Sequence, residues 1–115
     1  MKKTREEISA MMDSMNLPVA YYQFNEGTSQ APPFVVFFYS TDSDVFADDE
    51  NYVDKEQLNI ELYSKYREFD LEKQIEAILK ANDFTYYKEA SFIDTEKLYQ
   101  IAYEMEVIIN ESEQS

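Results

Sequence analysis

Carboxylates and phenols are the side chains that could do chemistry in this chain, which has 24 acidic residues and ten tyrosines among 115 residues. Histidine, cysteine and tryptophan are all absent. The commonest general base, the thiolate nucleophile and the usual zinc ligands are therefore missing together. The serines have no histidine to activate them, and a single glycine, Gly27, cannot build a phosphate-binding loop. We expect no enzymatic activity and no cofactor.

A calcium loop is the nearest match to a metal site, because Asp42 and Asp44 are spaced like its first two ligands. The match then fails, since Phe46 takes the place of the third ligand and Ala47 the place of the sharp-turn glycine. Val53 stands where a bidentate glutamate should close the loop. No spacing singles out a carboxylate pair for glycoside hydrolysis. We predict neither a metal site nor a sugar-cleaving one.

The net charge of −14 is unevenly distributed. No basic residue occurs between Arg5 and Lys55, and acidic residues crowd the end of this span: Asp42, Asp44, Asp48, Asp49, Glu50 and Asp54. Direct binding to nucleic acid or to an anionic membrane is disfavoured, because both need basic side chains. An acidic surface could instead meet a basic protein or line a passage in which DNA slides without sticking. The simpler alternative is that the charge only keeps the protein soluble.

The elements that must position these side chains can be read from the hydrophobic pattern. Thr4 and Glu7 form a capping-box pattern that opens a helix over residues 4–16, and Asp70 is a favourable N-cap for a second helix over 70–82. We predict strands over residues 19–24, 34–39, 52–64, 84–93 and 98–110. The clearest alternation lies in the last strand, which puts one set of apolar residues on one face: Tyr99, Ile101, Tyr103, Met105, Val107 and Ile109.

This element order, α-β-β-β-α-β-β, predicts one α+β domain over residues 1–110, with a flexible tail over 111–115. Runs of neighbouring strands favour an antiparallel or mixed sheet of about five strands, with both helices on one face. The longest apolar stretch, residues 32–39, is too short to cross a bilayer. Glu6 and Glu7 stand where a signal peptide needs an apolar run, so we expect a cytoplasmic protein.

Two tyrosine pairs are candidate interface residues. Tyr21–Tyr22 and Tyr86–Tyr87 each place neighbouring rings on opposite faces of a predicted strand, so at least one ring of each pair should be exposed. Tyrosine is enriched in protein interfaces because it joins apolar area to a hydroxyl. The other candidates lie in the acidic loop over residues 41–51, which with a loop over 25–33 would reach partners: Asp42, Asp44, Phe46, Asp48 and Asp49.

Several segments together resemble small proteins from the morphogenesis clusters of siphophages and prophages of Gram-positive bacteria. They are LPVAYYQF at residues 17–24, APPFVV at 31–36, LNIELY at 58–63, EKLY at 96–99 and YEMEV at 103–107. Their order and spacing carry the resemblance, which extends over residues 4–109. The family contains tail terminator, tail completion and head–tail joining proteins.

The resemblance implies an α+β domain that forms a ring, often a hexamer, at the end of the tail tube. It implies contacts with tail-tube or connector proteins and no catalytic residues. We expect a monomer in isolation that assembles in the host cytoplasm and is incorporated into the virion tail. Two other hypotheses stay open. The chain could be an acidic DNA mimic that inhibits a host nucleic-acid enzyme, or a small calcium-binding module that calcium would stabilise against heat.

Overall fold

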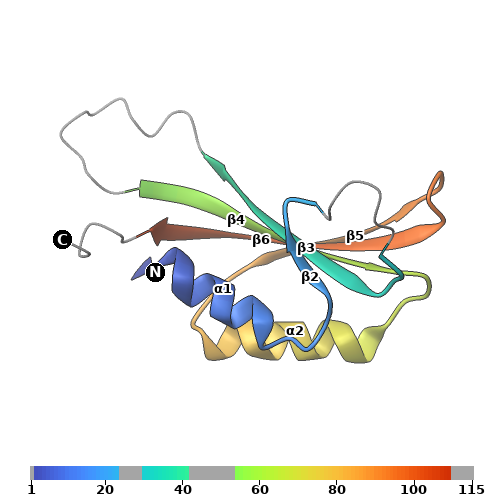
Figure 1. Cartoon of the computed structure of the whole chain (residues 1–115), viewed down its shortest axis with the longest axis horizontal. Helices are drawn as coiled ribbons and strands as arrows, with labels where there is room; N and C mark the ends of the chain where they lie inside the picture. Colours follow the sequence, from blue (N-terminus) through green and yellow to red (C-terminus); the bar gives the residue numbers. More distant parts are fainter. Residues whose placement is uncertain (1, 24–29, 42–53, 110–115) are drawn as a thin grey trace.

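The computed structural model describes residues 2–23, 30–41 and 54–109, and within them a mixed sheet is covered on one side by two helices (Figure 1). The strands are β1 (Lys2–Lys3), β2 (Val19–Tyr21), β3 (Phe34–Thr41), β4 (Asp54–Ser64), β5 (Tyr87–Ile93) and β6 (Leu98–Ile109). The helices are α1 (Arg5–Asp13) and α2 (Phe69–Ala81). The predicted α+β class is confirmed.

The sheet has the strand order β1-β6-β4-β3-β2, and β5 lies on the same side of β6 as β1. The pairing is antiparallel between β3 and β4, between β4 and β6, and between β6 and β5. The two short strands pair parallel, β1 with the last residues of β6 and β2 with the first half of β3. β5 and β2 therefore lie at opposite edges of the sheet.

The core lies between the helices and one face of the sheet. Alternate residues of β4 and β6 point into it, as the period-two pattern predicts: Leu58, Ile60 and Leu62 with Ile101, Tyr103, Met105, Val107 and Ile109. From the helices it receives Ile8, Met11, Met12, Ile75 and Leu79. We call the opposite side of the sheet the open face. β3 contributes Val35 and Phe37 to the core, whereas Val36 lies on the open face and is only 7% exposed.

The local signals at the helix ends hold for α1 and fail for α2. Thr4 caps α1, and its reciprocal hydrogen bonds with Glu7 measure 2.9 and 3.0 Å. The prediction that Asp70 caps α2 is wrong, because the helix begins at Phe69 and Glu68 occupies the N-cap position. Asp70 lies in the first turn instead, where a carboxylate is stabilised by the helix dipole.

The prediction also missed one strand and misplaced an end of several others, of which β2 and β5 differ most. β1 was not predicted, since two residues are too few to show a period. β2 ends at Tyr21 because the backbone of Tyr22 has φ 72°, which turns the chain out of the strand. β5 begins at Tyr87 instead of residue 84, and Phe84 packs in the core just after α2. The predicted tail and most of both predicted loops lie outside the described residues.

Candidate functional site

The edge of the sheet at β2 and β3 is left partly open. β2 pairs with β3 only from Val19 opposite Val35 to Tyr21 opposite Phe37. The amide of Tyr22 makes one further hydrogen bond, of 2.8 Å, to the carbonyl of Phe37. Within the described residues, no strand pairs with residues 38–41 of β3 on this side. Backbone groups on such an edge are available to another extended chain.

Aromatic rings surround this open backbone, and we call the residues Tyr21, Tyr22, Phe37, Phe38 and Tyr39 the aromatic edge. The ring of Tyr21 lies 5.2 Å from Phe37 and 5.9 Å from Tyr39, on the helix side of the sheet. The ring of Tyr22 lies 5.7 Å from Phe38, on the open face. Both tyrosines stay largely in solvent, with exposed fractions of 52% for Tyr21 and 66% for Tyr22. The exposure expected of this pair is therefore present, on both faces of the edge.

The backbone of Tyr22 is strained. Its φ of 72° is unfavourable for a bulky residue, which pays a steric cost there that glycine or asparagine avoids. Such strain persists only where the surrounding structure holds it, and it is concentrated at functional positions. Here it has two effects, since it ends β2 early and directs the Tyr22 ring onto Phe38.

A hollow of about 750 Å³ lies beside the aromatic edge on the helix side, lined by Arg5, Glu6, Ser9, Tyr21, Phe37, Tyr39 and Glu56. The guanidinium of Arg5 is 3.0 Å from the carboxylate of Glu56 and lies 4.7 Å above the ring of Tyr39. Partial burial raises the pKa of the Tyr39 phenol, and the nearby Arg5 charge offsets only part of that effect. The phenol therefore stays neutral at physiological pH. It can exchange hydrogen bonds but cannot act as a base.

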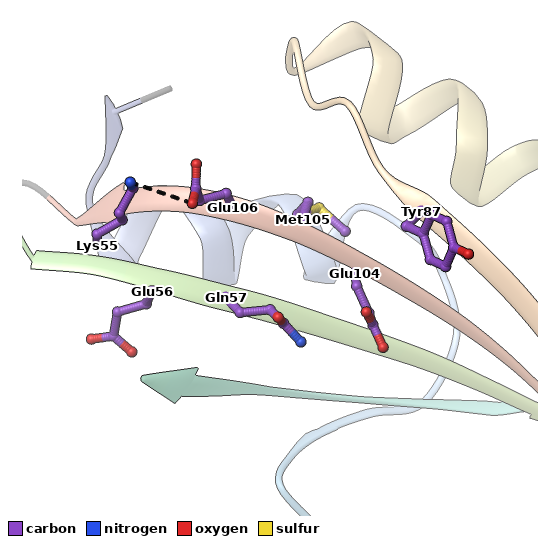
Figure 2. A pocket seen from close by; sticks show the side chains of 7 residues that line it. All are labelled: Lys55, Glu56, Gln57, Tyr87, Glu104, Met105 and Glu106. Atoms are coloured by element: carbon purple, nitrogen blue, oxygen red, sulfur yellow. Dashed lines mark ion pairs between the residues drawn. The ribbon is translucent and has the colours of Figure 1, made fainter. Parts of the chain in front are cut away.

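A second hollow, of about 220 Å³, lies on the open face between β4 and β6 (Figure 2). Glu104 and Glu106 project from β6 into this region, and Tyr87 lies opposite Glu104 at the start of β5. Lys55 supplies one cation, 3.6 Å from the carboxylate of Glu106. In the described part of the chain, no group of three acidic residues is close enough to hold a metal ion. This hollow is an acidic surface and lacks the convergent groups of a catalytic site.

A third hollow, of about 660 Å³, lies near the β5–β6 turn and includes Phe34, Tyr63, Lys65 and Lys97 in its lining. Phe34 and Tyr63 are stacked, with ring centroids 5.2 Å apart. The Tyr63 hydroxyl donates to Glu61 and accepts from Gln100, both at 2.7 Å. Burial and the Glu61 hydrogen bond raise the pKa of Tyr63 to about 12. These polar groups satisfy one another, so the hollow offers a ligand little beyond a shallow surface.

Comparison of the chain with family models, with curated proteins and with solved structures finds no match. The resemblance to tail-assembly proteins therefore stays a prediction. Among the described residues, neither helix has the length and apolar character that a membrane crossing requires.

A partly buried group of charges, which the sequence reasoning missed, connects α2 to β5 and β6. We call Arg67, Glu72, Glu76, Lys88 and Tyr103 the charge cluster. Glu72 is only 2% exposed, receives two hydrogen bonds from Arg67 at 2.9 and 3.1 Å, and pairs with Lys88 at 3.0 Å. Lys88 also pairs with Glu76 at 2.6 Å, and the hydroxyl of Tyr103 donates to Glu76 at 2.7 Å. A signal for it was present, because Glu72 shares one helix face with the core residues Ile75 and Leu79.

The structure does not bring the two predicted tyrosine pairs together. Tyr21 and Tyr22 belong to the aromatic edge, whereas Tyr86 and Tyr87 lie across the sheet beside β6. Tyr86 packs on Tyr103 with ring centroids 5.3 Å apart, and Tyr87 is 71% exposed. The acidic-loop candidates lie outside the described residues: Asp42, Asp44, Phe46, Asp48 and Asp49.

Proposed function

We propose that this chain is a structural protein of phage or prophage morphogenesis, which acts as a tail terminator, a tail completion protein or a head–tail joining protein. It works by ring assembly and protein–protein contacts, without catalysis. The observation that carries the binding role is the aromatic edge, where open β3 backbone and two exposed tyrosines lie together. The motif resemblance supplies the assembly context. The protein acts in the host cytoplasm during assembly and in the virion tail afterwards.

The chemistry of the aromatic edge suits a protein partner. Tyrosines near the centre of an interface supply much of the binding energy, because they bury large areas at little cost in side-chain entropy. The open backbone of residues 38–41 adds hydrogen bonds that are independent of the partner's sequence. Partners of this kind are other copies of the chain and subunits of the tail tube or connector.

The charge of the open face suits a ring through which DNA passes. Its carboxylates include Glu61, Glu104 and Glu106, and Glu89 lies in the same register on β5. Phosphates are repelled by such a surface, so DNA could move past it without being held. We propose that the open face lines the passage and that the helices face away from it.

The test is deletion of the gene from the prophage, followed by electron microscopy of induced particles. We expect heads without joined tails, or tails of abnormal length, and rescue by the wild-type gene. The double variant Tyr21→Ser, Tyr22→Asn should fail to rescue. The variant Tyr66→Ser is the matched control, because Tyr66 has the same 66% exposure as Tyr22 but lies after the last residue of β4, outside the aromatic edge. Normal particles after deletion would overturn the proposal.

The acidic open face also favours a second candidate, a DNA mimic that inhibits a host nucleic-acid enzyme. A mimic presents carboxylates to a basic cleft, and Glu104 and Glu106 on β6 are suitably exposed. Affinity capture from host lysate separates the two functions. The mimic would be favoured if a nuclease or polymerase is recovered with the wild type and is no longer recovered after charge reversal at Glu104 and Glu106. Recovery of tail proteins would favour assembly.

A further inference from the structure

We infer that copies of this chain join head to tail by sheet extension, with strand β5 of one copy added antiparallel to residues 38–41 of β3 in the next. This deepens the proposed function, on which it rests, by naming the contact between ring subunits. The partner is thus a second copy of the same chain, and the surfaces it uses are the two opposite edges of one sheet.

β5 has the properties of the donor strand. It is seven residues long and pairs only with β6 among the described strands, so its outer edge is open. Almost all of its residues are exposed, including Tyr87 at 71% and Phe92 at 47%. Soluble proteins normally keep such edges short or cover them, because an open edge invites pairing.

β3 has the properties of the acceptor. β2 covers only its first half, because the turn at Tyr22 ends the pairing, and no other described strand covers residues 38–41 on this side. The hollow lined by Tyr21, Phe37 and Tyr39 lies directly beside this stretch. An added strand would therefore find backbone partners at the edge and space for its alternate side chains on the helix side.

The strand directions fix how the two edges meet. β5 is antiparallel to β6, β6 is antiparallel to β4, and β4 is antiparallel to β3. β5 therefore runs antiparallel to β3 within one copy. A neighbouring copy that is placed alongside without being turned over presents its β5 antiparallel to this β3, with its helices on the same side of the extended sheet.

The side chains of β5 fit this arrangement. Ala90 and Phe92 lie in register with Ile101 and Tyr99, so they occupy the helix side and would meet the hollow. The half-exposed ring of Phe92 would then be buried among the rings of Tyr21 and Tyr39. Lys88 shares that face but is already held by Glu72 and Glu76, so it leaves no charge to be neutralised there.

Head-to-tail pairing is favoured over a two-fold contact for a further reason. A two-fold pairing of β3 with β3 leaves both β5 edges open, and pairing of β5 with β5 leaves both β3 edges open. Head-to-tail pairing uses one edge of each kind at every contact, and closure into a ring leaves none exposed. A single contact repeated around an axis therefore removes both aggregation-prone edges.

Engineered cysteines test this contact directly, because the chain has none of its own. Ser40→Cys marks β3 and Ser91→Cys marks β5, and both serines are exposed. The Cα atoms of facing residues on antiparallel strands are close enough for a disulfide. We would mix the two purified variants at rising concentration under mild oxidation and measure the covalent dimer by non-reducing electrophoresis, with light scattering in parallel. Thr95→Cys, exposed in the β5–β6 turn, is the matched control.

We expect the mixture of Ser40→Cys and Ser91→Cys to give several-fold more covalent dimer than either variant alone or either mixed with Thr95→Cys. Dominant self-linking of one variant would overturn the head-to-tail contact and leave a two-fold one. Oligomers that form without this cross-link would also overturn it. So would the absence of both oligomers and covalent dimer at the highest concentration reached, where even a chain that is monomeric when dilute should pair. None of these failures touches the proposed function, which the deletion phenotype tests separately.

Discussion

The charge cluster and the hollow beside the aromatic edge contain the same three kinds of side chain, an arginine, a glutamate and a tyrosine, in different settings. Arg5 pairs with Glu56 at 3.0 Å beside Tyr39, and Arg67 pairs with Glu72 at 2.9 Å beside the aromatic Tyr103. The glutamates differ, since the Glu56 side chain is 13% exposed and that of Glu72 only 2%. The tyrosines differ more, because Tyr103 is fully buried and Tyr39 borders an open hollow.

The difference shows that one set of chemical groups can be satisfied internally in one place and left beside solvent in another. In the charge cluster two cations face two carboxylates, and the phenol donates to one of them, so the group is neutral and internally satisfied. Buried networks of this kind make the packing specific and have nothing left for a partner. At the aromatic edge, no described strand pairs with the outer side of residues 38–41, and Tyr21 and Tyr22 are exposed.

The largest expected effect separates the two glutamates. Glu72→Gln should lower the free energy of unfolding by about 3 kcal/mol, because Arg67 and Lys88 lose a buried counter-charge. This value is the lower end of the range found when one partner of a buried ion pair is removed, since both cations reach solvent. Glu56→Gln should cost only about 0.5 kcal/mol, because Arg5 is well exposed. Urea denaturation of both variants measures this. Equal losses would contradict the contrast.

The pH dependence of stability sharpens the same comparison. Burial raises the pKa of Glu72, but the hydrogen bonds from Arg67 and Lys88 outweigh it and hold the pKa below its ordinary value of 4.5. The stabilisation is therefore fully present above pH 4.5 and is lost as the pH falls through the folded-state pKa. We expect the stability gap between the wild type and Glu72→Gln to narrow in acid. A constant gap would argue against the ion pairs as its source.

The two tyrosine hydroxyls provide a smaller contrast. Tyr103→Phe should cost about 1.5 kcal/mol, because a buried hydroxyl that donates to the Glu76 carboxylate is removed. Tyr39→Phe should cost no more than about 0.5 kcal/mol, because its hydroxyl lies beside open solvent. Thermal unfolding of the two variants side by side gives the ranking. A greater loss for Tyr39→Phe would show that the aromatic edge is structural.

The smallest effect on stability is expected at Tyr22. Tyr22→Asn should leave the free energy of unfolding within about 0.5 kcal/mol of the wild type, because relief of the positive φ offsets the lost contact with Phe38. The variant should nonetheless weaken self-association, measured by light scattering. A loss of about 2 kcal/mol in the free energy of unfolding would mean that the Tyr22 ring stabilises the fold. The strained backbone of Tyr22 would then no longer support a role in binding.

Pattern and propensity were enough to predict much of this fold. The alternation in β4 and β6 predicted their buried faces, and Thr4 with Glu7 predicted the start of α1, because both signals are local. The aromatic edge could not be predicted beyond the exposure of its tyrosines. It depends on where β2 stops against β3, which the backbone of Tyr22 decides, and on which strands become neighbours.

The charge cluster marks the other limit of the sequence reasoning. The helical spacing of Glu72 predicts burial, but its partners Arg67 and Lys88 come from a loop and from β5. Only the packing of α2 beside β5 brings them together, and no short window of sequence contains all three. β1 escaped detection for a similar reason, since its two residues become a strand only through contact with β6.

The place of β6 in the sheet also has a consequence for synthesis and folding. β6 pairs with β1, β4 and β5, and all three precede it in the chain. Its contact with β1 joins Lys2 to Ile108, nearly the full length of the described chain. On the ribosome, the sheet therefore lacks its central strand until residue 109 has been made, and contacts of such long range slow folding. If the chain assembles as we propose, its subunit contacts form only after β6 has been translated, which separates the synthesis of each copy from its assembly.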